Sequence, residues 1–309
     1  MSDYTLRNTA PSDRLEVADL IYLSTNHWYQ VHGRPAVFTG GPAVAAVYFD
    51  VYEALDPGCG VVAVHNETGR IIGSCFYHPR ETHVSLGIMN SHPSHAGTGV
   101  ARALLARIID FAEGRRQPLR LVFSAMNLDS FSLYTRAGFV PRGAYQDMLL
   151  AVPPKGLRIK ALLRQWVRPA RISDVAAMGE LEMEVAGIRR EKDYRRFIQN
   201  PDGFWHVSVM EARDGGLQGF CASCSHPGCN MIGPCVARGA KQAAALVAAE
   251  LDRHRGRTPV FLVPVDCPEL VWAAYRWGAR NCEIHFSQVR GPAQPIRGVL
   301  MPTFLPETA

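Results

Sequence analysis

The chain has 309 residues, of which 47% are hydrophobic and 20% are charged, and its net charge is +5. This length favours two domains, each with its own core, and no apolar run reaches the roughly 18 residues that a membrane helix needs. The basic excess is small and lacks interleaved aromatic residues, so we expect neither nucleic acid nor a membrane as a partner.

Residues 1–13 show neither the apolar segment of a secretory signal nor the Arg- and Ser-rich pattern of an organelle-import sequence. Eight cysteines are spread along the chain, whereas a disulfide framework is typical of short secreted proteins. We therefore expect reduced thiols and a cytoplasmic location.

Strand and helix patterns alternate through the first half. The sequence predicts a helix over residues 11–28, a strand hairpin over 61–79 with Thr68 and Gly69 at its turn, and a third strand over 83–91. A helix over 99–114, a buried strand over 119–126 and a second helix over 130–138 follow.

The second half repeats this order of elements. It has a helix over 171–185, a hairpin over 205–227 with Gly215 and Gly216 at its turn, a helix over 237–254, a strand over 259–266 and a helix over 270–278. A repeat of this size can close its own core, unlike the short repeats of a solenoid. We predict an α/β (α+β) fold with two domains, residues 1–152 and 158–309. Each domain should be a mixed sheet flanked by helices. A linker that contains proline and glycine, residues 153–157, joins them.

The segment from His92 to Ala101 places two glycines, Gly97 and Gly99, between a strand and a helix. Glycines let a ligand approach the backbone closely, and the first N–H groups of a helix are unpaired donors at the positive end of its dipole. Such a turn can bind a pyrophosphate, although a short G-x-G before a helix also occurs as a purely structural turn.

A second motif begins at Asn127 and continues as Ser130, Leu133, Tyr134, Gly138 and Phe139. With Gly97, Gly99 and Ala101, it resembles the two motifs of the GNAT superfamily of N-acetyltransferases, Q/R-x-x-G-x-G/A and N-x-x-A/S-x-x-L-Y-x-x-x-G-F. The resemblance covers residues 3–150 well and the rest in outline. It implies two tandem GNAT-like domains, the second degenerate, each with a centrally splayed sheet.

For the site, the resemblance implies acetyl-CoA (CoA) held between two splayed parallel strands, with its pantetheine arm pairing like an extra strand. The backbone of Met89 and Ser91 would bond the pantetheine amides. Tyr134 would be the general acid that protonates the leaving thiolate, since a phenol keeps its proton at neutral pH; a packed helix aromatic is the alternative. The turn formed by Ala96, Gly97, Thr98, Gly99, Val100 and Ala101 would hold the pyrophosphate. Asn127 and Ser130 would line the other wall of the cofactor site, and Tyr134 would contact the cofactor as well.

Two departures from the family pattern concern the phosphate contact and the general base. Ala96 stands where Gln or Arg is usual, and the sequence does not fix where Arg102 or Arg136 points. Residues 85–91 contain no acid, although many family members have a glutamate there. Strand alternation would place the two candidate bases, Glu81 and His83, on one face; a solvated carboxylate and a partly buried histidine are the alternatives.

The second half lacks a G-x-G before its helix, and in the later motif Cys267 falls opposite Asn127 while Ala274 falls opposite Tyr134. We therefore expect a degenerate copy. The spacing Cys221-x-x-Cys224-x-His226-x-x-Cys229 invites a zinc site, but Gly219-x-Cys221 aligns with Gly73-x-Cys75 on a strand, and alternation separates Cys221 from Cys224. We expect no metal.

These patterns predict an acyl-CoA-dependent N-acyltransferase that moves an acetyl group to the primary amine of a small molecule, such as an amino sugar, a polyamine or an amino acid derivative. A wall of aromatic residues with two acids could hold this amine, unless the same residues form a core-facing helix: Trp28, Tyr29, Phe38, Tyr48, Phe49 and Tyr52, with Asp50 and Glu53. A CoA-binding sensor or scaffold without turnover is the alternative function, and a homodimer is left open.

Overall fold

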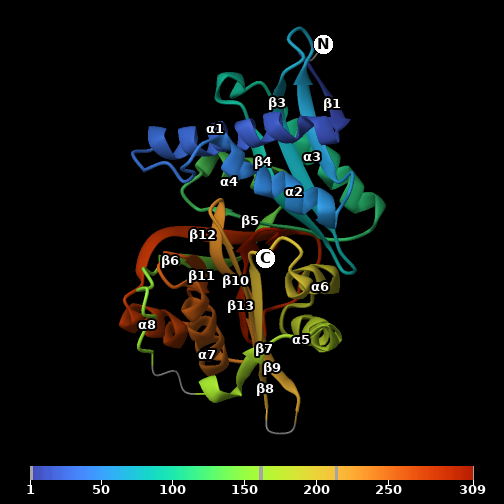
Figure 1. Cartoon of the computed structure of the whole chain (residues 1–309). Coiled ribbons are helices and arrows are strands. Elements are labelled where there is room, and N and C mark those ends of the chain that lie inside the picture. Colours follow the sequence, from blue (N-terminus) through green and yellow to red (C-terminus); the bar gives the residue numbers. More distant parts are fainter. Residues whose placement is uncertain (1–2, 160–162, 213–214, 309) are drawn as a thin grey trace. The chain divides into compact units, whose positions relative to one another are not determined.

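The computed structural model describes residues 3–159, 163–212 and 215–308 (Figure 1). Its contacts divide the chain into two compact units. Unit 1 comprises Met1–Pro79, Val84–Leu119 and Leu305–Glu307, and unit 2 comprises Arg80–His83, Arg120–Phe304 and Thr308–Ala309. These units are not the two sequence halves, so the domain bounds inferred from the sequence remain a prediction. Within the hairpin predicted over 205–227, Arg213 and Asp214 lie outside the described residues.

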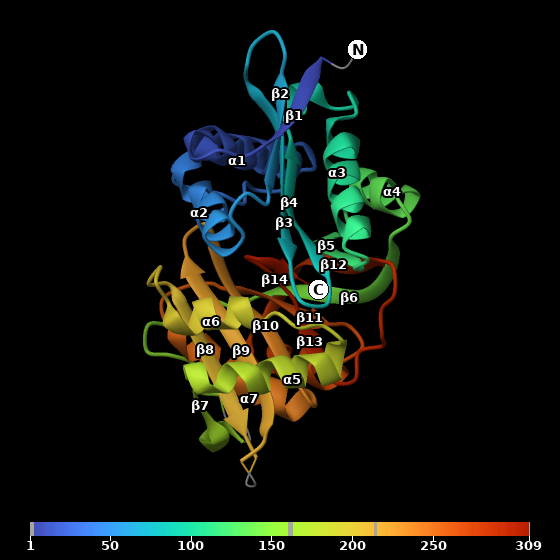
Figure 2. The same ribbon diagram turned by 90° about the vertical axis from the view of Figure 1, so that its right-hand side faces the viewer.

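In unit 1, strands β1 to β4 pair antiparallel in chain order. Helices α1 and α2 cover one face and α3 covers the other (Figure 2). The bounds are β1 Tyr4–Asn8, η1 Pro11–Asp13, α1 Arg14–Val31, η2 Pro42–Ala45, α2 Ala46–Leu55, β2 Gly60–His65, β3 Ile71–Pro79, β4 Val84–Ser91, η3 Pro93–His95 and α3 Val100–Gly114.

Helix α3 packs closely on β3 because Gly73 has no side chain. A Cβ atom at Gly73 would lie 2.4 Å from Val100 Cγ1 and 3.1 Å from Leu104 Cδ1. The buried side chains of α3 recur at helical spacing, as an amphipathic helix requires: Val100, Leu104, Leu105, Ile108 and Ala112. This packing fixes where α3 begins relative to the end of β4.

In unit 2, strands follow the order β5, β12, β6, β11, β10, β9, β8, β7, and β13 pairs with β10. Helices α7 and α8 lie on one side of this sheet and α5 and α6 on the other (Figure 1). The bounds are β5 Leu119–Ser124, α4 Leu128–Arg136, β6 Val140–Leu149, η4 Arg164–Trp166, β7 Val167–Pro169, η5 Ile172–Asp174, α5 Val175–Ala186, α6 Glu191–Gln199, β8 Trp205–Glu211, β9 Leu217–His226, β10 Cys229–Ala237, α7 Ala240–Leu251, η6 Asp252–His254, β11 Val260–Pro264, α8 Pro268–Trp277, β12 Arg280–Arg290, β13 Val299–Met301, β14 Thr303–Phe304 and β15 Glu307–Thr308.

The two sequence halves exchange strands inside unit 2. β6, from the first half, pairs antiparallel with both β11 and β12 of the second half. β12 in turn lies between β5 and β6. Apolar side chains from both halves share one core there, including Met148, Leu246, Phe261 and Val263. Each half therefore completes its sheet with a strand of the other.

The two halves of the predicted internal repeat share the same Arg–Asp ion pair before their first long helix. Arg7 Nη1 lies 2.6 Å from Asp13 Oδ2 before α1, and Arg168 Nη1 lies 2.7 Å from Asp174 Oδ2 before α5. Each aspartate also accepts a hydrogen bond from a backbone N–H three residues earlier, at 2.8 Å and 2.7 Å. The mixed α/β fold is confirmed, and no described helix is both long and apolar enough to cross a bilayer.

Candidate functional site

A β-bulge bends β4 just before the predicted cofactor residues in unit 1. Gly87 and Ile88 stand opposite the single residue Phe76, between the pairs Cys75–Met89 and Tyr77–Leu86. A Cβ at Gly87 would lie 2.8 Å from His78 Nε2 and 3.1 Å from the Phe76 carbonyl oxygen, so the bulge requires glycine. Bulges re-aim a strand and are frequent next to active sites. Met89 and Ser91 form the last part of β4 after this bend.

The turn after β4 is held by local hydrogen bonds and by left-handed glycines. The N–H of His95 donates to the His92 carbonyl at 2.9 Å, and the Thr98 hydroxyl donates to the His95 carbonyl at 2.7 Å. Gly97 has φ +77° and Gly99 has φ +86°, values that disfavour other residues. A Cβ at Gly97 would meet no atom within 4 Å. The turn thus presents bare backbone at its surface.

Helix α3 starts directly at this turn, and its first N–H groups have no partner within the helix. Its first internal hydrogen bond runs from the N–H of Ala103 to the Gly99 carbonyl at 3.0 Å, so the N–H groups of Val100, Ala101 and Arg102 have no partner within the helix. The Arg102 Nη2 atom is 3.6 Å from where a Cβ of Gly99 would stand. A guanidinium therefore lies beside the turn in which Ala96 lacks the usual polar side chain. Donors, helix dipole and arginine together suit a diphosphate.

The second predicted motif lies in unit 2, at the start of α4. The Asn127 side-chain oxygen accepts a hydrogen bond from the N–H of Ser130 at 2.9 Å, so Asn127 is the N-cap of α4. Tyr134 is 6% exposed, and its ring packs edge-on against Phe123. The predicted cofactor residues therefore form two groups: Met89, Ser91 and Ala96–Ala101 lie together in unit 1, and Asn127, Ser130 and Tyr134 lie together in unit 2.

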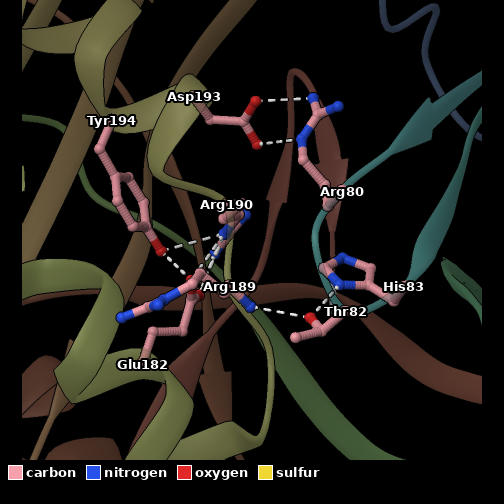
Figure 3. A network of polar contacts seen from close by, with 8 residues as sticks. All are labelled: Arg80, Thr82, His83, Glu182, Arg189, Arg190, Asp193 and Tyr194. Atoms are coloured by element: carbon pink, nitrogen blue, oxygen red, sulfur yellow. Dashed lines mark hydrogen bonds and ion pairs between the residues drawn. The ribbon is translucent and has the colours of Figure 1, made fainter. Parts of the chain in front are cut away.

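The two candidate bases lie in the turn between β3 and β4, where strand alternation does not apply. The expectation that Glu81 and His83 share one face of a strand is wrong for this reason, since β3 ends at Pro79 and β4 begins at Val84. Glu81 is exposed and His83 is fully buried. The Thr82 hydroxyl lies 3.0 Å from His83 Nδ1 and accepts from the N–H of Arg189 at 2.9 Å (Figure 3).

The aromatic residues expected to hold the acceptor form mainly a core-facing helix. Tyr48, Phe49 and Tyr52 of α2 are at most 6% exposed, and the rings of Phe49 and Tyr52 contact Phe76. The two acids are engaged as well, since Asp50 accepts from Arg14 at 2.6 Å and Glu53 accepts from the Thr9 hydroxyl at 2.6 Å. Trp28 and Tyr29 of α1 remain partly exposed.

Sequence reasoning missed a buried histidine and carboxylate pair in unit 1. His78 Nδ1 lies 2.7 Å from Asp56 Oδ2, and both side chains are 1% exposed. The His78 ring also contacts Tyr52 at 4.5 Å between centroids. Asp56 is the C-cap of α2 and His78 lies on β3, 22 residues later, so no short motif joins them.

In the second half, a strand of the chain itself occupies the edge that corresponds to Met89–Ser91. The bulge is conserved in form, because Gly233 and Pro234 stand opposite Ala222, between the pairs Ile232–Ser223 and Cys235–Cys221. Beyond it, Cys235–Ala237 pair antiparallel with Met301–Val299 of β13. This part of β10 therefore already has a strand partner at the edge where we expect Met89 and Ser91 of the first half to bind pantetheine.

A hollow of about 750 Å³ remains in the second half, at the start of α7 and α8. Its charged lining residues are Lys241 and Arg276 against Asp266 and Glu269, so they add no net positive charge for a polyphosphate. Cys267 also lines it, and burial raises the pKa of this thiol, which disfavours the nucleophilic thiolate. The hollow lies at helix starts, as a phosphate site would, but its lining lacks the net positive charge that such a site needs.

Among the described residues, one group of three potential metal ligands was not anticipated, namely Asp147, Glu283 and His285. Asp147 of β6 and Glu283 of β12 are cross-strand partners, and His285 Nδ1 is 2.9 Å from Asp147 Oδ2. Burial raises the pKa of Asp147, and the nearby charge of Glu283 adds to this. The residues come from both halves, so their spacing carries no motif.

Two family models match the chain. A model of the acetyltransferase (GNAT) family matches residues 25–139, and a model of an acetyltransferase (GNAT) domain matches residues 178–290. Together they span more than two thirds of the chain. No curated protein matches the chain.

Solved structures share the fold at low identity. A protein of Pyrococcus horikoshii named as an acetyltransferase is 14% identical with a TM-score of 0.74, over 100% of this chain and 97% of that one. A GCN5-related N-acetyltransferase from Sphaerobacter thermophilus is 16% identical with a TM-score of 0.65, over 96% and 99%. A tandem GNAT protein from the clavulanic acid biosynthesis pathway is 15% identical with a TM-score of 0.59, over 94% and 100%. The predicted tandem fold is confirmed.

Proposed function

Because this chain is an acetyltransferase of the GNAT family with two GNAT domains in tandem, we propose that its first half transfers an acetyl group from acetyl-CoA to the primary amine of a small molecule. The observation that carries the proposal is the contrast between the two halves. After β4 the backbone ends in a bare, donor-rich turn, whereas the corresponding edge of β10 is paired with β13.

The turn in unit 1 fits the diphosphate of CoA. Left-handed Gly97 and Gly99 keep side chains out of the space in front of it. The N–H groups of Val100, Ala101 and Arg102 would donate to phosphate oxygens, and the Arg102 guanidinium would add the positive charge that Ala96 does not supply. CoA, when bound, would bring the acetyl group as an activated thioester.

The proposed reaction also needs two proton transfers, one from the acceptor amine and one to the leaving sulfur. The acceptor amine must lose a proton before its lone pair can attack a carbonyl, and exposed Glu81 is our candidate base. Tyr134 would hold a proton on its hydroxyl and donate it to the sulfur that leaves. We favour an amino sugar or an amino acid derivative over a polyamine, because Asp50 and Glu53 are already engaged by Arg14 and Thr9.

The test is thiol release from acetyl-CoA across a panel of primary amines, with wild type, Tyr134→Phe and Glu81→Gln. We expect amine-dependent release, a fall of about 10²-fold or more in kcat for Tyr134→Phe, and a shift of the pH profile to higher pH for Glu81→Gln. Phe keeps the ring packing, so a loss in that variant reports on the hydroxyl. CoA binding without turnover on any amine would instead support the sensor alternative.

A further inference from the structure

A bulge in β12 brings three potential metal ligands to one face of the sheet in unit 2. β12 has one extra residue, Cys282, just before the point where Glu283 pairs with Asp147 of β6. Residues that pair directly across two strands point to the same face, and so does the residue two positions further along. This register therefore places Asp147, Glu283 and His285 together. Asp147 comes from the first half of the chain, and the other two come from the second half.

The three side chains lie close enough to share one ion. One potential ligand atom of each residue lies within 4.8 Å of those of the other two. His285 Nδ1 is 2.9 Å from Asp147 Oδ2. Two ligand atoms that each lie about 2.1 Å from an ion, at right angles to each other, are about 3.0 Å apart. The contact between His285 and Asp147 thus has the spacing of neighbouring ligands.

Asp147 and His285 are buried with polar atoms that the surrounding residues leave unsatisfied. Asp147 is 3% exposed and His285 is 7% exposed. Within the part of the chain that the structure describes, neither Asp147 Oδ1 nor His285 Nδ1 has a hydrogen-bond partner. The two groups attract each other, but their contact lacks the alignment of a hydrogen bond. Since buried polar atoms are nearly always satisfied, two unsatisfied ones in a single cluster indicate a further partner such as an ion.

The electrostatics of this cluster favours a cation. Burial disfavours the charged form of Asp147 and so raises its pKa; the charge of His285 acts in the opposite direction, and the charge of Glu283 raises the pKa further. On the other neighbouring strand, β11, the residue paired with Asp147 is the buried and apolar Leu262. A divalent cation would take the place of a proton on Asp147 and neutralise both carboxylates.

The types of ligand atom select the class of ion. One imidazole nitrogen with two carboxylates suits Zn²⁺ or another divalent transition-metal ion, whereas Mg²⁺ and Ca²⁺ prefer oxygen ligands alone. The ring of Phe304 packs against His285 with 4.9 Å between the centroids, which restrains the orientation of the imidazole. Glu283 is only partly buried, so a hydrated ion could enter from its side of the cluster.

We propose that Asp147, Glu283 and His285 bind one divalent transition-metal cation of the Zn²⁺ type, which links the two halves of the chain across β6 and β12. Three protein ligands leave at least one coordination position for water. Because the ion joins two strands that come from different halves, its binding stabilises the folded chain. The site uses none of the residues proposed for acetyl transfer and does not depend on that function.

The test is titration of the reduced, metal-free, full-length protein with Zn²⁺ in competition with a chromogenic chelator. We expect one high-affinity site per chain and at least about tenfold weaker binding of Mg²⁺ and Ca²⁺. Asp147→Asn and Glu283→Gln each remove a charged ligand but keep the side-chain shape, so each should weaken Zn²⁺ binding at least about tenfold. The position of Glu283 is partly exposed, so Glu283→Gln should fold even if Asp147→Asn does not.

Thermal unfolding gives a second readout of the same site. Saturating Zn²⁺ should raise the unfolding temperature of wild type by about 5 °C. Zn²⁺ should leave the unfolding temperature of Glu283→Gln almost unchanged at the same concentration. An equal rise in both proteins would show that the stabilising ion binds elsewhere and would contradict the proposal.

His206→Gln and His95→Gln are the control variants. His206 belongs to another histidine–carboxylate pair of unit 2, in which its Nδ1 lies 2.9 Å from Glu250 Oε1. His95 is partly exposed, and its ring lies near those of His65 and His92, where Zn²⁺ could bind at the surface. Both variants should bind Zn²⁺ like wild type.

Three results would overturn the proposal. The first is the absence of stoichiometric Zn²⁺ binding to wild type, which would leave Asp147 and His285 as a simple ion pair. The second is equal Zn²⁺ affinity of Glu283→Gln and His206→Gln. The third is a loss of affinity in His95→Gln without one in Glu283→Gln, which would place the ion on the surface histidines. None of these measurements depends on acetyl transfer.

Discussion

The backbone of Ala237 lies opposite that of Val299 in an antiparallel pair. The corresponding residue of the first half is Ser91, which pairs with Gly73 of β3, and the part of the chain that the structure describes shows no counterpart of β13 beside it. If CoA needs this edge, only one of the two domains can bind it. We therefore expect calorimetric titration with CoA to give about one site per chain. Two equivalent sites would show that β13 leaves the edge when ligand binds.

Gly97→Ala tests the turn, with Gly69→Ala as its matched control. Both glycines have left-handed φ, +77° and +68°, and neither would bring a Cβ within 4 Å of another atom. Each substitution should therefore cost a similar backbone strain of about 1–2 kcal/mol. Only the methyl group at residue 97 would face the proposed phosphate, so we expect CoA affinity to fall in Gly97→Ala and to persist in Gly69→Ala. Equal affinities would remove the turn from the site.

His254 should make unit 2 sensitive to mild acid. It is 1% exposed, its Nδ1 lies 2.9 Å from Asn230 Oδ1, and burial lowers its pKa to about 4. The unfolded chain takes up this proton near its ordinary pKa of about 6.5, so the unfolded state binds more protons between the two values. Stability should fall as the pH drops from about 6.5 to about 4, by at most about 3 kcal/mol.

The measurement is urea unfolding at several pH values, with His254→Gln and His27→Gln. The first variant should lose part of the pH slope, because glutamine does not titrate. His27 is exposed, so its variant should keep the wild-type slope. A slope that is unchanged in His254→Gln would show that other groups cause the acid sensitivity.

The ion pair between Arg80 and Asp193 should be worth much more than a surface pair. Arg80 Nη2 lies 2.6 Å from Asp193 Oδ1, and the two side chains are 2% and 0% exposed (Figure 3). Asp193→Asn keeps the shape but removes the charge that balances a buried guanidinium, so we expect a loss of about 3–5 kcal/mol. Asp50→Asn breaks an exposed pair with Arg14 and should cost below about 1 kcal/mol. Similar unfolding midpoints for the two variants would contradict this ranking.

Helix bounds and helix caps, which depend on a short stretch of sequence, could be predicted. Asn127 caps α4 and Gly138 follows its end with φ +86°, as the motif indicates. Helix α3 covers Val100–Gly114, within one residue of the predicted 99–114. These features depend on neighbouring residues, so hydrophobic periodicity and capping chemistry are enough to locate them.

Features that depend on distant residues were not predictable. The pairing of Ala237 with Val299 and of Asp147 with Glu283 joins segments that share no local signal. Arg120 reads as an ordinary charge in a strand, yet it is buried. Strand alternation does not relate Glu81 to His83, because both lie in the turn between Pro79 and Val84, which has no glycine to mark it in the sequence.

The exchange of β6 and β12 makes the halves of this duplicated chain mutually dependent. A chain cut in the segment 153–157 would give two fragments, and each would lack a central strand that the other carries. Neither fragment should be stable alone, although co-production should restore the sheet by complementation. Each half therefore supplies a strand that the other needs, which gives a structural reason for both halves to be kept together.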